Sequence, residues 1–415
     1  MKDHTSVDGT VSNVRVPLSV INAAGAFGGQ PVQDALQGDL VIKDGRVVGM
    51  LPSSQPDIPA RIVLPKFTEA HVHLDKCHTI SRMEGVGGDL QAAIDAQAKD
   101  RLGWTTEDIR ARASLGLDEL VSSGCGTVRT HVDWGQPANH SAPSKAWPIL
   151  CELKEEYRDK LTMQIAPLTG IEDLADLTTA DRIARQIADK GGVLGSFVFD
   201  QTERESGIRN AFKMAEKHGL ALDFHVDEGL EDGLDGLAII AETAISMDFQ
   251  GPVLCGHACS LMNQSSIELD RLAEKLAKAR ISVVSLPSAN LYLQGRTEGT
   301  PDRRGLTRIR ELQEAGVNMV IGTDNVRDAF CPLGRFDPRQ TLALATLAAH
   351  LDPPFGRYLP MITTNARAAL GLAPQTVDEA AIGDLIQFDA NSTADLLGGV
   401  MAPRPLSAVF QGDSE

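Results

Sequence analysis

The chain reads RNAFKMAEKHGLALDFHV over residues 209–226, and this stretch contains a complete helix-to-strand unit. Residues 209–219 carry apolar side chains at three- and four-residue spacing and stop at a glycine, as an amphipathic helix does. The next residues, 220–226, form a short apolar run rich in strand-forming side chains and closed by polar ones. This stretch therefore predicts a helix that packs beside a buried strand.

The same unit recurs along most of the chain. The other apolar runs are IVLPKF (62–67), GTVRTHV (126–132), LTMQIAPL (161–168), VLGSFVF (193–199), PVLCGH (252–257), ISVVSLP (281–287) and VNMVIGT (317–323). Helical patterns such as residues 106–124 and 309–316 lie between them. Eight strands alternating with helices predict an α/β fold, a closed parallel (β/α)₈ barrel of the TIM type. An open doubly wound sheet is the alternative, but the chain has no Gly-rich phosphate motif that would favour it.

The two ends of the chain carry a different pattern. Residues 39–51 read DLVIKDGRVVGML, in which Asp44 and Gly45 suit the two-residue turn of a hairpin. Near the other end, DLIQFDA (384–390) and LSAVF (406–410) alternate like strands. We therefore expect residues 1–65 and 379–415 to form one small β-sandwich-like domain, with the barrel occupying residues 66–378.

Charge and hydropathy narrow the classes of partner. The 415 residues include 39 Lys and Arg against 56 Asp and Glu, a formal net charge of −17. Nucleic-acid binding is not expected, because phosphate recognition needs a basic surface. The first residues, MKDHTSVDG, lack a basic and apolar leader, and no apolar run is long enough to span a bilayer. These features predict a cytoplasmic protein without a membrane partner, and homo-oligomerisation is left open.

Polar residues gather where the predicted strands end, which is where barrel enzymes place their catalytic side chains. His71 and His73 follow the first run as HVH, and residues two apart on an extended segment point the same way. His225 closes the fifth run and Asp324 follows the eighth. Three imidazoles and a carboxylate suit one Zn²⁺ or Fe²⁺ with a position left for water. Any one of these histidines alone would more often be structural, but the set at one face predicts a metal site.

Two further residues complete a hydrolytic site. Glu228, three residues beyond His225, is the candidate proton shuttle, because an ion that lowers the pKa of water to about 7 still needs a group that moves protons. His257 closes the sixth run and is expected to orient the hydroxide or to stabilise developing charge. We expect Glu228, His257 and Asp324 to carry the catalysis. No G-x-S-x-G elbow suggests a serine nucleophile instead.

With these residues identified, the chain resembles the amidohydrolase superfamily, and within it the cytosine deaminase group. The motifs that carry the resemblance are PKFTEAHVHLDK (65–76), GTVRTHVD (126–133), HVDE (225–228), NLYLQGR (290–296), PDRRGLTR (301–308) and GTDNVRDAFCPLG (322–334). The resemblance implies that His71, His73, His225 and Asp324 bind one catalytic metal, that Glu228 moves protons and that His257 assists the hydroxide. It also implies hydrolysis at a ring carbon of a small heterocycle with release of ammonia.

The residues expected to contact the substrate depart from that group. Its members carry a Gln just past strand three, where this chain reads APLTGIED and offers Leu168 and Thr169. Asn325 stands where they carry a second Asp, and an amide both donates and accepts hydrogen bonds. Phe330 falls where the cytosine deaminases place an aromatic residue that covers the substrate ring, which favours a flat substrate. Residues 323–334 also resemble the triazine-processing branch, which includes N-isopropylammelide isopropylaminohydrolase.

The leading hypothesis is a metal-dependent deaminase of a cytosine-like pyrimidine or related cyclic amidine. The alternative within the class is an aminohydrolase or cyclic amidase acting on triazine-like or lactam rings. A catalytically silent relative that binds a small molecule is a remote alternative, since no ligand or shuttle residue is missing. Strand four, VLGSFVF, carries no Lys that could be carboxylated, so we expect one metal ion rather than two.

Overall fold

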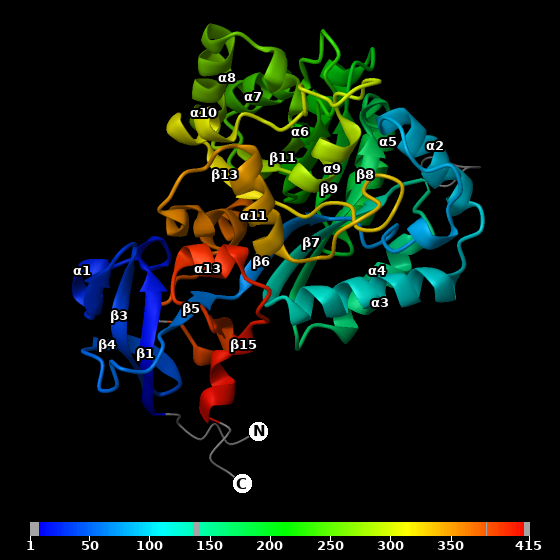
Figure 1. Cartoon of the computed structure of the whole chain (residues 1–415). Helices are drawn as coiled ribbons and strands as arrows, with labels where there is room; N and C mark the ends of the chain where they lie inside the picture. The colour runs from blue at the N-terminus through cyan, green and yellow to red at the C-terminus, as the bar shows by residue number, and fades with distance from the viewer. Residues whose placement is uncertain (1–7, 136–141, 379, 411–415) are drawn as a thin grey trace.

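The computed structural model describes residues 8–135, 142–378 and 380–410, which form two sheets with surrounding helices. Figure 1 shows the larger sheet enclosed by the helices of the middle of the chain, with the smaller sheet beside it. The smaller sheet brings the two ends of the chain together, as the blue and red strands show. The fold is the α/β barrel predicted from the alternation of strands and helices.

The larger sheet has eight strands in the sequential order β13-β12-β11-β10-β9-β8-β7-β6, and each neighbouring pair is parallel. Its strands are β6 (Phe67–Val72), β7 (Cys125–Asp133), β8 (Thr162–Gly170), β9 (Leu194–Val198), β10 (Leu222–Val226), β11 (Val253–His257), β12 (Ser282–Ser285) and β13 (Asn318–Ile321). A parallel bridge between Val72 and Asp324 joins the two outer strands. This bridge turns the sheet into a barrel.

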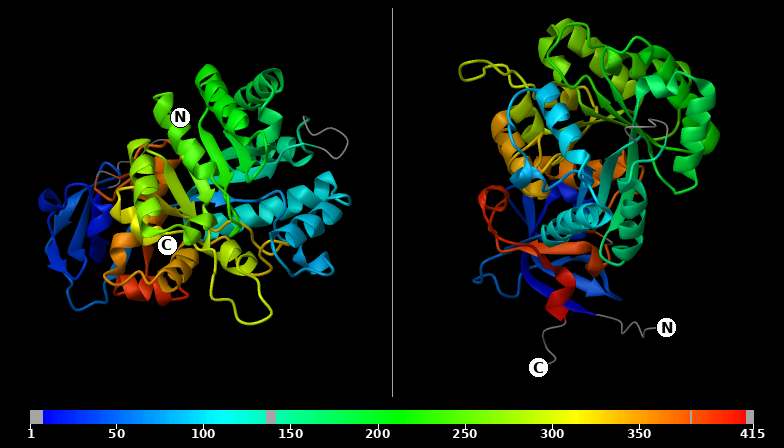
Figure 2. Two further views of the ribbon diagram at one scale, coloured as in Figure 1. Left: turned by 90° about the horizontal axis from the view of Figure 1, so that it is seen from above. Right: turned by 90° about the vertical axis from the view of Figure 1, so that its right-hand side faces the viewer.

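Helices follow the strands and cover the barrel in the three views of Figures 1 and 2. They are α2 (Leu90–Arg101), α3 (Thr106–Ser122), α4 (Ala146–Glu156), α5 (Leu177–Ala188), α6 (Arg204–His218), α7 (Gly236–Ser246), α8 (Ser266–Lys278), α9 (Pro287–Leu293), α10 (Ile309–Glu314), α11 (Pro338–Ala348) and α12 (Thr364–Ala369). Several begin at residues whose side chains accept a backbone N–H of the first turn, including Asp89, Thr105, Asp176, Ser265 and Asp337. Within the described residues, no helix has the length and apolarity needed to cross a membrane.

The first barrel strand lies later in the chain than predicted. The run at residues 62–67 was expected to be that strand, but β5 (Arg61–Pro65) pairs with β14 and β1 of the smaller sheet. The barrel begins instead at Phe67, the first residue of β6. Both strands are buried, but β5 (RIVLP) is the more apolar, and β6 (FTEAHV) carries Thr68, Glu69 and His71, so a search for apolar runs selects β5. As a result, His71 lies within the first barrel strand and only His73 follows it.

The smaller sheet has seven strands from both ends of the chain, in the order β15-β14-β5-β1-β3-β2 with β4 beside β3. The strands not yet named are β1 (Gly9–Pro17), β2 (Gln30–Val32), β3 (Ala35–Lys43), β4 (Arg46–Leu51), β14 (Leu385–Phe388) and β15 (Arg404–Pro405), with short helices α1 (Ala24–Phe27) and α13 (Thr393–Gly398). Asp44 and Gly45 form the predicted hairpin turn, both with positive φ. The prediction for LSAVF is wrong, because Leu406–Phe410 is a 3-10 helix that follows β15.

We propose that the smaller sheet corresponds to a domain made of residues 1–65 and 379–415, with the barrel domain at 66–378. Residues 1–7, 379 and 411–415 of that division, and residues 136–141 of the barrel, lie outside the described residues. The chain passes between the sheets at Lys66, whose backbone N–H donates to Asp384 O at 2.9 Å. This hydrogen bond ties the start of the barrel to the C-terminal segment.

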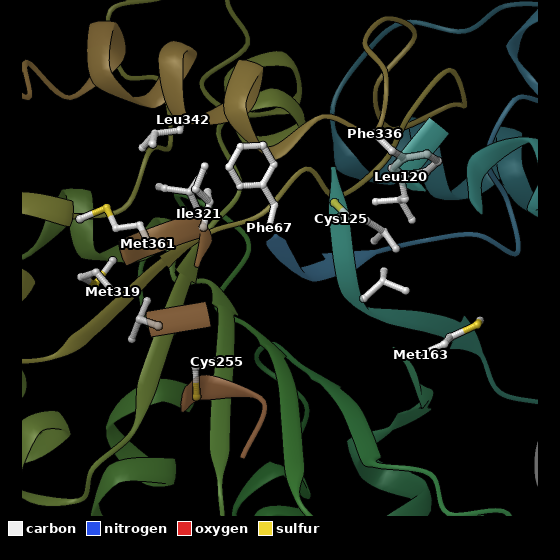
Figure 3. Close-up of a cluster of buried hydrophobic side chains, with 14 of the residues drawn as sticks. Phe67, Leu120, Cys125, Met163, Cys255, Met319, Ile321, Phe336, Leu342 and Met361 are labelled. Carbon is white, nitrogen blue, oxygen red and sulfur yellow. The ribbon is translucent and has the colours of Figure 1, made fainter. Parts of the chain in front are cut away.

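A continuous apolar core joins the strands to the helices around them. Figure 3 shows part of it, with Phe67 of β6, Leu120 of α3 and Leu342 of α11 among the labelled side chains. Close packing also extends to glycines: a Cβ on Gly207 of α6 would lie 2.1 Å from the carbonyl oxygen of Ile171. The core therefore fixes the helices closely against the barrel.

We predict that Gly207→Ala destabilises the protein, because the new methyl group would meet backbone rather than a flexible side chain. Overpacking of this kind costs about 1–3 kcal/mol. Urea unfolding of both proteins measures the change. Gly383→Ala is the control, since a Cβ there meets nothing within 4 Å. Equal unfolding free energies for the two variants would contradict this view of the α6 contact.

Candidate active site

Two of the predicted metal ligands, His71 and Asp324, lie where the first and last barrel strands meet. The backbone N–H of Asp324 donates to His71 O at 2.8 Å, beside the Val72–Asp324 bridge. Just below, the buried Glu69 carboxylate accepts from His71 N at 3.1 Å, from Thr323 N at 3.2 Å and from the Thr323 hydroxyl. Burial raises the pKa of Glu69 to about 7 in spite of these hydrogen bonds. Glu69 therefore holds β6 and the segment after β13 together under the site.

The four predicted ligands lie in one cluster of buried side chains, which His71 links together. His71 Nε2 and His73 Nε2 lie 3.5 and 3.4 Å from the same oxygen, Asp324 Oδ1. His73 Nε2 lies 3.1 Å from His225 Nε2. All four side chains are buried, with at most 5% of any residue exposed. The donor atoms of His71, His73 and His225 lie within 4.8 Å of one another, as do those of His71, His257 and Asp324.

The chemistry of these donors fits a bound cation. Both ring nitrogens of His71 and both oxygens of Asp324 are buried without a hydrogen-bond partner. Burial lowers the pKa of His73 to about 3 and that of His225 well below its usual range. Burial would raise the pKa of Asp324, but His71 and His73 outweigh it and hold the carboxylate ionised. Neutral imidazoles and an ionised carboxylate are the forms that bind metals.

Small residues make room for the His71 ring. A Cβ on Gly256 of β11 would lie 3.0 Å from His71 Cε1, and one on Gly322 would lie 3.1 Å from His71 Cβ. Backbone strain marks the same region, since His257 and Asp324 have φ values of 68° and 65°. Positive φ at such residues persists where the surroundings hold it, and often at functional sites.

Glu228 and His257 lie together at the edge of this cluster. Glu228 Oε1 is 3.3 Å from His257 Nδ1, and Asn290 Nδ2 is 3.0 Å from the same nitrogen. Donation by the Asn290 amide would leave the His257 proton on Nε2, which has no partner. Burial, together with the charge of Asp324, raises the pKa of Glu228 well above its usual range. Glu228 can therefore hold a proton at neutral pH.

Two of the residues predicted to contact the ring, Asn325 and Phe330, lie against charged side chains. Asn325 donates through Nδ2 to Asp328 Oδ2 at 2.6 Å, which leaves its carbonyl oxygen as an acceptor. The Phe330 ring lies 5.2 Å from Lys76 Nζ, and Lys76 is bound to Asp133 at 2.7 Å. Burial would lower the pKa of Lys76, but Asp133 and Asp75 outweigh it, so Lys76 stays charged.

The hydrogen bonds of Leu168 and Thr169 are made to neighbouring backbone groups. The Thr169 hydroxyl donates to Gly195 O at 2.9 Å, and Leu168 O accepts from Trp134 N at 3.0 Å. These bonds fasten β8 to its surroundings and do not join either residue to the metal donors. Both side chains are buried.

The sequence analysis missed a group of polar residues in the barrel interior. His131 of β7 belongs to the histidine cluster, with its ring 4.1 Å from that of His71. Its Nε2 lies 3.0 Å from Asp223, which is bound to Arg129 at 2.7 Å. Alternation could have found them, because Arg129 precedes His131 by two residues and Asp223 precedes His225 by two.

Comparison with known proteins places the chain in a family. The model of the Amidohydrolase family matches residues 83–394. The chain is 30% identical to the pterin deaminase of Rhizobium rhizogenes over 406 residues, covering 95% of this chain and 91% of that protein. The chain belongs to the amidohydrolase family.

Two further proteins are similar to this chain over most of its length. The N-isopropylammelide isopropyl amidohydrolase of Pseudomonas sp. is 25% identical over 347 residues, 81% of each chain. The crystal structure of 5-methylcytosine deaminase from Klebsiella pneumoniae superposes with a TM-score of 0.78 at 24% identity, covering 96% of both chains. The predicted resemblance to the amidohydrolases is thus confirmed, and this amidohydrolase is a hydrolase that acts on carbon–nitrogen bonds.

We predict that Zn²⁺ raises the unfolding temperature of the metal-free amidohydrolase and fails to do so in Asp324→Asn. At a concentration 100-fold above Kd, binding to the native state contributes about 2.7 kcal/mol. The variant keeps the side-chain size and removes the negative charge on which His71 and His73 converge. Calorimetry with and without Zn²⁺ measures the shift.

Asp337→Asn is the matched control, because Asp337 is also buried but caps α11, a role that Asn fills about as well. The control should keep the full Zn²⁺ shift. An undiminished shift in Asp324→Asn would remove Asp324 from the set of ligands.

Proposed function

We propose that this amidohydrolase uses one divalent ion, Zn²⁺ or Fe²⁺, to remove ammonia from a cyclic amidine. His71, His73, His225 and Asp324 would hold the ion. The observation that carries the proposal is the convergence of their buried donor atoms, which lack other partners, beside a carboxylic acid. When bound, such an ion supplies the Lewis acidity that lets water ionise near neutral pH.

The chain's own residues would move the protons. Water adds to the ring carbon that bears the amino group, while Glu228 gives its proton to the neighbouring ring nitrogen. Glu228 then takes the two protons of the added oxygen in turn: it passes the first to the amine and keeps the second as the carbon–nitrogen bond breaks, which leaves ammonia, a ring carbonyl and the restored acid. His257, through Nε2–H, would stabilise the charge that develops on the added oxygen. Burial of both residues keeps bulk water from competing.

The side chains predicted to contact the ring and the names of the relatives both support a substrate class. Phe330 offers a face to a flat ring, and Asn325 and Lys76 offer an acceptor and a charged donor to its edge. The similar protein with 30% identity is a pterin deaminase. We therefore place 2-amino-4-oxopteridines first among the candidates and cytosine-like pyrimidines second, since both contain the same amino-substituted C–N unit. Leu168 and Thr169 would line the pocket wall.

The remaining parts of the proposal concern the setting. We infer a cytoplasmic enzyme whose partner is a small heterocycle, with no part for nucleic acid, in keeping with the net charge of −17. Association into a homo-oligomer is compatible with this site, which the described residues build within one chain.

Ammonia release by the metal-loaded protein tests the activity. The panel is 2-amino-4-oxopteridine, cytosine, 5-methylcytosine and N-isopropylammelide. We expect ammonia from the pteridine at the highest kcat/KM. Isopropylamine from the ammelide, with no ammonia from the other three, would instead establish an aminohydrolase of triazine-like rings. The likeness to the ammelide amidohydrolase favours this alternative.

We predict that Glu228→Gln lowers kcat by about 10²- to 10⁴-fold, the range for loss of a general acid–base group. Metal content should stay at the wild-type level, because Glu228 is not one of the proposed ligands. Glu231→Gln is the control, an exposed residue three positions further on that should keep wild-type kcat. Full turnover by Glu228→Gln would exclude the proton path.

A further inference from the structure

Beneath the proposed metal ligands, the barrel interior holds charges where such barrels usually place branched apolar side chains. Arg129 and Asp223 have no exposed surface, and each lies two residues before a histidine of the cluster. Residues two apart on a strand point to the same side, so Arg129 and Asp223 form the layer directly below His131 and His225.

This buried layer is fixed by its own contacts. Arg129 binds Asp223 Oδ2 through one terminal nitrogen at 2.7 Å. Its other two guanidinium nitrogens donate to Gln164 Oε1 at 3.0 and 2.7 Å. Gln164 donates in turn to Leu370 O at 3.1 Å, and Leu370 directly follows α12. The Asp223 carboxylate is therefore held in one orientation, with its second oxygen left for another partner.

His131 lies against that second oxygen and connects the layer to the metal ligands. Asp223 Oδ1 lies 3.0 Å from His131 Nε2. The His131 ring lies 4.1 Å from the His71 ring, 4.6 Å from the His225 ring and 5.4 Å from the His73 ring, between centroids. One imidazole thus packs against all three proposed histidine ligands.

Stability alone does not account for these charges. A buried ion pair is often no better for folding than apolar residues of the same volume, and can be worse. A carboxylate next to a histidine at a metal site fixes the ring and its tautomer, and loss of such outer partners weakens metal binding by about 10- to 100-fold. The arrangement fits the second purpose.

We propose that Arg129, Asp223 and His131 form a positioning chain for the metal site, in which the fixed Asp223 orients His131 and His131 holds the rings of His71 and His225. In this role, His131 keeps its proton on Nε2, toward Asp223, and is not itself a ligand. The inference rests on the proposed set of four ligands and adds residues outside it.

Zn²⁺ affinity, measured by competition with a chromophoric chelator, tests the proposal without using activity. We expect Asp223→Asn and His131→Phe to raise the Kd for Zn²⁺ by about 10- to 100-fold. The d–d absorption of the Co²⁺-loaded variants should also differ from that of the wild type. Arg339→Met is the control, because Arg339 is equally buried but binds the Leu396 and Gly399 carbonyls near α13. It should lower thermal stability and leave Kd and spectrum unchanged.

The possible outcomes distinguish failure of the proposed metal site from failure of the positioning chain. A wild-type protein that binds no Zn²⁺ would overturn the metal proposal itself. Wild-type affinity and spectrum in both Asp223→Asn and His131→Phe would overturn only the positioning chain.

If neither variant folds, ¹⁵N-histidine NMR of the Zn²⁺-loaded wild type decides. A protonated Nε2 on His131 with no metal coordination is expected, and a coordinated His131 would refute the role.

Discussion

The hydrogen bond from the Asp324 amide to the His71 carbonyl is the interaction on which the site depends. It lies where the last barrel strand meets the first. The contact that closes the barrel therefore also brings two proposed ligands together. Glu69 reinforces this seam from below by accepting from His71 and Thr323. A fold without this closure would leave Asp324 about 250 residues from His71 along the chain with nothing to bring them together.

Burial then sets the electrostatics. The imidazoles and Asp324 are all enclosed, and the low pKa of His73, about 3, reflects burial first and the charge of Lys76 second. The same enclosure raises the pKa of Glu228 well above its usual range. The pKa values of two carboxyl groups in one site thus move in opposite directions, because His71 and His73 lower that of Asp324 while burial and the charge of Asp324 raise that of Glu228. Such a pair suits a reaction that needs both an anionic ligand and an acid.

Sequence patterns predicted much of this arrangement. Alternating strand and helix patterns predicted the barrel, and HVH, HVDE and the Asp after the last strand predicted residues that the structure brings together. The roles assigned to these residues stay predictions. The first strand was misplaced because β5 is the more apolar segment, whereas polar residues interrupt β6. The pairing of β5 with β14 and β1 assigns it to the other sheet. LSAVF alternates like a strand, yet the whole segment, Leu406–Phe410, forms a 3-10 helix.

The layer beneath the ligands was missed for a different reason. Attention to strand ends favours residues such as His225 and His257. Arg129 and Asp223 lie inside strands, and their position two residues before a histidine was not used. Their partners, Gln164 and His131, come from other parts of the chain, so only the folded barrel reveals them. Long-range pairing of this kind is what single-sequence patterns do not encode.

Anomalous diffraction from crystals of the Zn²⁺-loaded protein, recorded on both sides of the zinc edge, tests the central claim most directly. The account predicts one peak per chain, bound by His71, His73, His225 and Asp324, with His131 and Glu228 outside the coordination sphere. A peak elsewhere, a second peak bridged to the first, or direct coordination by His131 would contradict it.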